Sequence, residues 1–166
     1  MSSSFDIPDV DLLTTGAVGP VGQRVFYLQV RHDGRVMSFR LEKTQVAAMC
    51  RYLESMLDNL APADPVEQDM SLVEPIVPEW VVGNLRVQYD QDDDRFILEA
   101  DEVVEEDDED GATARISATR AQVAALIRHG SEVVAAGRPP CPLCGGPLDP
   151  EGHMCVRLNG HRDLAP

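Results

Sequence analysis

Lys43-Thr-Gln-Val-Ala-Ala-Met49 and Arg120-Ala-Gln-Val-Ala-Ala-Leu126 share the string Gln-Val-Ala-Ala, and this pair of stretches sets the expected fold. The match extends upstream, where Arg24-Val-Phe-Tyr-Leu28 aligns roughly with Asp94-Arg-Phe-Ile-Leu98. Two helices of an alanine-rich protein can also share such a string by chance. We favour the other interpretation, in which one structural unit occurs twice, as after an old duplication.

Both strings lie in amphipathic helical patterns. Apolar residues recur at every third or fourth position after each string, as they do on one face of an α-helix. The first pattern predicts a helix from about Lys43 to Leu60, and the second predicts a helix over Thr119–Ala136. Thr119 followed three residues later by Gln122 is the pattern of a capping box, which indicates where the second helix starts.

Three strand-like segments precede each predicted helix. They are rich in β-branched and aromatic residues or alternate apolar with polar residues, and turn residues separate them. The expected strands are Val10–Val18, Arg24–Arg31, Val36–Leu41, Val81–Tyr89, Arg95–Val104 and Ala112–Ser117. Six mostly antiparallel strands would then carry both helices on one face, which is a two-layer α+β domain.

Prolines and glycines divide the chain into parts. Four prolines lie between residues 61 and 79 and predict a linker, because proline fits neither a helix interior nor a central strand. We expect one domain over residues 1–137, built from duplicated βββα units at about 8–60 and 80–137. Residues 138–166 form a separate small tail.

The formal net charge of -15 limits the classes of partner. Nucleic-acid-binding proteins neutralise phosphates with clustered Lys and Arg, so an acidic field of this size disfavours a nucleic-acid ligand. It disfavours an anionic membrane surface for the same reason. The N-terminal residues lack the basic head and apolar stretch of a signal peptide, and no apolar run is long enough to span a membrane. We therefore expect a cytoplasmic protein.

The motif with the clearest chemistry is Cys141-Pro-Leu-Cys144-Gly, which Cys155 follows. Two thiolates three positions apart on a tight turn can bind one metal ion, and the glycine after them lets backbone amides point at the sulfurs. Zn²⁺ takes four N or S ligands in a tetrahedron. A shell filled by protein leaves no position for a substrate, so we predict one structural zinc ion per chain in a small knuckle or ribbon. Cys50 lies alone in a helical pattern and is interpreted as a small core residue.

Two histidines can supply the fourth ligand. His153 lies two residues before Cys155, so both side chains fall on one face of an extended strand. His161 lies six residues after Cys155, a spacing that suits a short helical turn or a returning loop. We favour His153 and keep His161 as the alternative.

A catalytic constellation is not evident elsewhere in the sequence. His32 lies in a His-Asp-Gly turn and is interpreted as a solvated residue, and His129 has no identifiable partner. No pair of carboxylates has a recognisable spacing for acid–base catalysis. The acidic run Glu105–Asp110 lacks the alternation of a calcium loop, so we interpret it as a solvated hairpin loop.

Several stretches carry a resemblance to a known family. They are Gly19-Pro-Val-Gly-Gln-Arg-Val-Phe-Tyr-Leu-Gln29, Leu41-Glu-Lys-Thr-Gln-Val-Ala-Ala48, Ala136-Gly-Arg-Pro-Pro-Cys-Pro-Leu-Cys-Gly145 and Leu148-Asp-Pro-Glu-Gly-His-Met-Cys155. In these stretches the chain resembles the actinobacterial DUF3090 family, a domain of unknown function. The resemblance covers most of the chain, apart from the first few residues and the acidic run.

The resemblance has implications for the tail and for the biological context. The family's tail has the pattern Gly-His-x-Cys followed by Asn-Gly-Tyr-Arg. His153 matches this pattern, whereas His161 stands where tyrosine is common, so the resemblance implies Cys141, Cys144, His153 and Cys155 as the ligands. Family members are often encoded near a histidine phosphatase-like protein and a kinase-like protein, which implies a shared pathway without assigning a role.

Two functions fit these observations. The first is a protein-binding or adaptor module, because an α+β domain with a small rigid zinc module is suited to docking another protein. The acidic charge would favour a partner with a basic surface. The alternative is an enzyme that acts on a small molecule or a modified protein, with its pocket between the two repeated units. We favour the first and leave the oligomeric state open.

Overall fold

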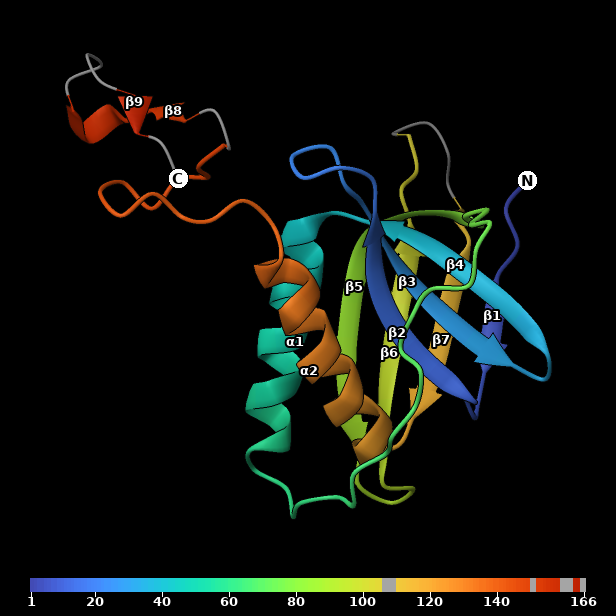
Figure 1. Ribbon diagram of the computed structural model, residues 1–166. Coiled ribbons are helices and arrows are strands. Elements are labelled where there is room, and N and C mark those ends of the chain that lie inside the picture. Colours follow the sequence, from blue (N-terminus) through green and yellow to red (C-terminus); the bar gives the residue numbers. More distant parts are fainter. Residues whose placement is uncertain (106–109, 150–151, 159–162, 165–166) are drawn as a thin grey trace.

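The computed structural model describes residues 1–105, 110–149, 152–158 and 163–164. It contains a seven-stranded sheet with two helices packed against it, and a small module at the C-terminal end (Figure 1). The predicted α+β class with a mostly antiparallel sheet is confirmed. None of the helices in these residues is long and apolar enough to cross a membrane.

The main elements follow the predicted order, with one addition. They are β1 (Phe5–Ile7), β2 (Leu12–Val18), β3 (Val25–His32), β4 (Arg35–Leu41), α1 (Lys43–Leu57), β5 (Trp80–Asp90), β6 (Arg95–Glu102), β7 (Thr113–Ala118) and α2 (Arg120–Ala135). The added strand is β1, which pairs with β7 in parallel. With three residues it is too short to show a period of two.

The sheet has the strand order β1-β7-β6-β5-β4-β3-β2. Strands β2, β3 and β4 form one antiparallel half, and β5, β6 and β7 form the other. The halves meet where β4 and β5 pair in parallel, at Phe39 opposite Trp80 and Arg40 opposite Val81. Beyond this short seam the halves diverge, and their strands run across one another in Figure 1.

The core lies between the sheet and the two helices. The ring centroids of Phe39 and Trp80 are 4.6 Å apart at the seam, so these two side chains pack the halves together. α1 and α2 lie side by side, and they pack tightly at Gly130, where an added Cβ would lie 2.6 Å from the sulfur of Cys50. Cys50 is buried in this core, which confirms the interpretation made from its helical pattern.

A glutamine closes the start of each helix in the same way. Oε1 of Gln45 accepts a hydrogen bond from the N–H of the N-cap residue of α1, and Oε1 of Gln122 does so for α2. The amide groups then reach across to the other half. Nε2 of Gln45 donates to the carbonyl of Val82 in β5 at 3.2 Å, and Nε2 of Gln122 donates to the carbonyl of Val10 at 2.8 Å.

The proline-rich segment 61–79 crosses the outer face of β2, β3 and β4 (Figure 1). The buried side chain of Gln29 holds it by pairing with both the N–H and the C=O of Val73, at 2.8 and 3.2 Å. Thr14 donates to the carbonyl of Met70, and Leu72 packs so closely on Gly16 that a Cβ there would lie 2.6 Å away. The predicted linker is therefore a strap that covers one face of the first half.

Candidate metal centre

The tail begins with a knuckle that brings two cysteines together. The N–H of Gly145 donates to the carbonyl of Cys141 at 2.9 Å, and the N–H of Cys141 donates to the carbonyl of Gly146 at 2.7 Å. Gly145 has a φ of 72°, a left-handed conformation that glycine adopts without strain. The turn leaves the N–H of Leu143 3.5 Å from the sulfur of Cys141, so a backbone amide points at a sulfur as the motif predicted.

The two remaining residues of the cluster come from the end of the tail. His153 lies in a two-residue strand, β8 (His153–Met154), which pairs with β9 (Asp163–Leu164). Cys155 follows directly and precedes a 3-10 turn, η1 (Val156–Leu158). The ligand atoms of Cys141, Cys144, His153 and Cys155 all lie within 4.8 Å of one another, so the four side chains are clustered and could bind a metal ion.

The sulfur–sulfur distance between Cys141 and Cys155 matches that of two thiolates on one tetrahedral zinc ion. With Zn–S distances of about 2.3 Å, a tetrahedron places two sulfurs about 3.8 Å apart. Sγ of Cys141 lies 3.8 Å from Sγ of Cys155, and Sγ of Cys144 lies 3.9 Å from Nε2 of His153. The thiols of Cys141 and Cys155 are buried, whereas Cys144 and His153 are partly exposed. Three thiols and one imidazole are also donors that Zn²⁺ prefers.

The thiols influence one another's ionisation. Burial opposes ionisation of Cys141, but hydrogen bonds from backbone N–H groups of the knuckle and from the side chains of His153 and Cys144 together lower its pKa to about 6. At Cys144 a backbone N–H favours the thiolate, yet burial and the sulfurs of Cys141 and Cys155 raise its pKa. Thiolates this close together repel one another, so the three thiols do not all ionise in the absence of a cation. A divalent cation would offset the repulsion, because it binds thiols in their deprotonated form.

His153 is the histidine that the structure brings to the three cysteines. The alternative ligand, His161, lies outside the described residues, as does most of the acidic run, residues 106–109. An ion pair between Arg138 and Asp149, at 2.9 Å, closes the base of the knuckle. The identity of the metal and the ligand set stay predictions at this point.

A second group of metal-ligating atoms was not predicted. Asp11, His32 and Asp33 have ligand atoms within 4.8 Å of one another, at the turn between β3 and β4. Nδ1 of His32 lies 2.6 Å from the carbonyl of Asp9, and the N–H of Asp33 donates to Asp11 at 2.9 Å. These hydrogen bonds tie the turn to the segment before β2, and they account for the grouping without an ion. His129 lies on α2 beside a small hollow next to the strap.

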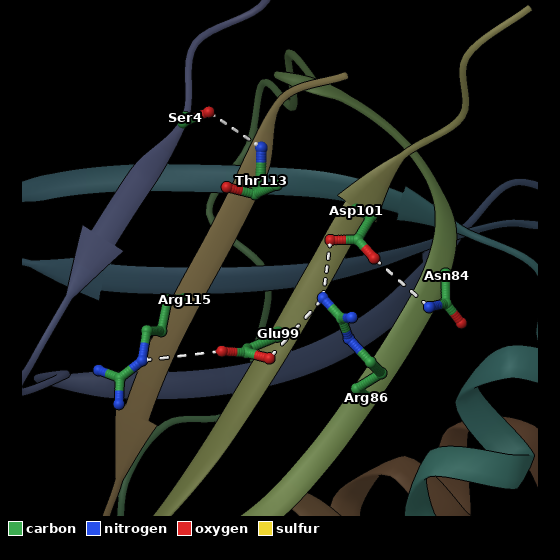
Figure 2. A network of polar contacts seen from close by, with 7 residues as sticks. All are labelled: Ser4, Asn84, Arg86, Glu99, Asp101, Thr113 and Arg115. Carbon is green, nitrogen blue, oxygen red and sulfur yellow. Dashed lines mark hydrogen bonds and ion pairs between the residues drawn. The ribbon is translucent and has the colours of Figure 1, made fainter. Parts of the chain in front are cut away.

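The outer face of the second half carries alternating charges rather than apolar groups. Figure 2 shows Arg86 of β5 between Asp101 and Glu99 of β6, at 3.2 and 3.7 Å, with Asn84 near Asp101. Arg115 of β7 continues the row to Glu99 at 3.8 Å. These four charged side chains are partly exposed, so the row faces solvent.

A cavity of about 570 Å³ lies between α1 and β5. Its walls come from α1 and from β5. α1 contributes Gln45 and Tyr52, and β5 contributes Asn84 and Arg86, beside several apolar side chains. None of the side chains that line the cavity in the described structure is a carboxylate, an imidazole or a thiol.

These features define an α+β protein with a cluster of three cysteines and one histidine that could bind a metal ion. A family model with the description "Protein of unknown function (DUF3090)" matches residues 4–155, and the chain belongs to this family. The match takes in the sheet, both helices and all four residues of the cluster. Neither the curated proteins nor the solved structures gave a match.

Proposed function

We propose that this protein binds one structural zinc ion through Cys141, Cys144, His153 and Cys155, and that the metal-held tail docks on another protein. The close grouping of three thiols and one imidazole carries the proposal. Four protein ligands complete a tetrahedral shell, so the metal would hold the tail together and would not activate water or substrate. Reduced thiols of this kind fit the reducing cytoplasm.

The surface of the tail supports the docking role. Leu143, Met154 and Val156 are 45%, 70% and 83% exposed, respectively, although all three are apolar. Leu148 is buried in the same module, so its small interior is already filled. Apolar side chains left outside a metal-held module are available to a partner. The net charge of -15 favours a partner with a basic surface.

Two variants separate the metal from the docking surface. Elemental analysis of the purified chain should give one zinc per molecule, and Cys144→Ser should lose it while the sheet and helices stay folded. Met154→Ser should keep the zinc. Cross-linking in cells should give reproducible partner bands with the wild type. These bands should be absent with both variants. An iron-containing chain, or partner bands unaffected by Met154→Ser, would contradict the proposal.

The enzyme alternative has one observation in its favour, the cavity between α1 and β5. Its polar lining, Gln45, Tyr52, Asn84 and Arg86, can hydrogen-bond to a ligand. Among the side chains that line it in the described structure, Tyr52 can act in general acid–base chemistry, and no carboxylate, imidazole or thiol accompanies it. We therefore keep protein binding as the proposed function.

A further inference from the structure

Strand β5 has one edge that is largely free of strand partners. β6 pairs with it along nearly its whole length, whereas β4 pairs only at Trp80 and Val81. After Leu41 the chain turns into α1 and leaves β5. In the described part of the chain no strand pairs with Gly83–Asp90 on that side, and the side-chain amide of Gln45 takes up the carbonyls of Val82 and Gly83, so the free edge starts at Asn84. A strand edge of this kind presents unpaired N–H and C=O groups and is a template for another extended chain.

The cavity between α1 and β5 runs along this free edge. Five consecutive residues of β5, Gly83–Val87, line it. Successive side chains of a strand point to opposite faces, so a cavity lined by five residues in a row borders the edge of the strand rather than one face. Five residues of a strand span about 13 Å, which is enough for an extended segment of about four or five residues.

Local structure keeps the groove open. The register of β5 against β6 shifts between Val82 and Asn84, so Gly83 is the extra residue of a bulge. A Cβ at Gly83 would lie 3.1 Å from Cα of Val103, which is tighter than an ordinary van der Waals contact. Bulges bend a strand and increase its local twist. On the opposite wall, α1 presents the small and exposed Ala48, which leaves room beside the edge.

We propose that this groove binds an extended segment of a partner protein, which adds to the free edge of β5 as a further strand. The segment would alternate apolar residues, packed against Met49, Leu85 and Val87, with polar residues that face solvent. It would be net basic, because the chain as a whole carries 29 acidic and 14 basic residues. The proposal goes beyond the metal-held tail and does not depend on it.

The test uses the full-length chain as purified. A display library of random dodecapeptides is panned against it, and the most enriched peptide is synthesised. Binding is measured by titration, and amide hydrogen exchange locates the contact. We expect alternating, net basic sequences, and slower exchange at Asn84–Asp90 in the bound state. Amide hydrogen exchange is measured on the wild-type protein, so this test of the groove does not depend on whether a variant folds.

A pair of tryptophan variants completes the test. Ala48→Trp fills the groove and should weaken peptide binding at least about tenfold. Thr44→Trp is the matched control, since Thr44 is also exposed on α1 but does not line the cavity, and it should leave the affinity unchanged. Cys144→Ser should also leave it unchanged, so a failure of the metal proposal would not be confused with a failure of this one.

Several outcomes would overturn the proposal. These are a library without enrichment, protection of amides outside β5, enrichment of acidic sequences, or equal affinity of Ala48→Trp and the wild type. Concentration-dependent protection of Asn84–Asp90 in the free protein would also overturn it, because the occupant of the edge would then be a second copy of this chain.

Discussion

Gly130 of α2 faces the thiol of Cys50 of α1 with no room for a methyl group between them, since a Cβ at Gly130 would lie 2.6 Å from the sulfur. Gly130→Ala should therefore destabilise the protein by about 1–3 kcal/mol, although alanine is the better helix former. Urea unfolding measures the change. In a Cys50→Ala background the same substitution should cost much less, and equal costs in both backgrounds would contradict the packing argument.

Cys50 should also respond to pH. Burial, followed by the nearby charge of Glu54, raises its pKa to about 11 from the usual 9. The folded state thus holds the neutral thiol more strongly than the unfolded chain does. Its contribution to stability is fully present below pH 9 and is lost as the pH rises through about 11. The free energy of unfolding should fall more steeply over this range in the wild type than in Cys50→Ala.

The four cysteines should differ in reactivity once metal is removed. A chelator added to the folded protein should expose Cys141, Cys144 and Cys155 to a chromogenic thiol reagent near neutral pH. Cys50 should react only after a denaturant is added, because the thiolate is the reactive form and this thiol is buried and neutral. A chelator without effect on the thiol count would argue against a metal in the cluster.

Gln29 should be the main anchor of the strap. Gln29→Ala leaves the N–H and C=O of Val73 without their partner, at a cost of about 1–3 kcal/mol. Limited proteolysis should then cut within residues 61–79 at a higher rate. Gln68→Ala is the matched control. Gln68 lies in the strap and donates one exposed hydrogen bond to the carbonyl of Asp11, so its loss should change neither stability nor cleavage.

The helix starts were predictable from local sequence, because each depends on residues three apart. The box of Thr119 and Gln122 is present, and α2 begins at Arg120. α1 begins at Lys43 as predicted but ends at Leu57, before the predicted Leu60. The prediction was too long because the amphipathic pattern continues beyond the last turn of the helix. The cysteine cluster was also predictable, because its four residues lie within a short stretch of sequence, Cys141 to Cys155.

The features that the sequence did not indicate depend on contacts between distant segments. β1 forms only because β7, more than a hundred residues later, offers it an edge. The strap depends on a buried glutamine, Gln29, that reads as an ordinary strand residue. The free edge of β5 depends on the residue at which β4 stops pairing with it. No local sequence pattern indicates that residue. The duplication stays an interpretation, although both halves have the same order of elements.

The reciprocal contacts of Gln45 and Gln122 bear on how this chain folds as it leaves the ribosome. α1 is complete long before β5 emerges, yet the amide of Gln45 needs a carbonyl of β5, and the segment before β2 must wait for Gln122. In the first half of the nascent chain, Nε2 of Gln45 therefore lacks its partner until β5 is made, and the carbonyl of Val10 lacks its partner until α2 is made. Release of the whole chain, rather than of either half, completes the native structure.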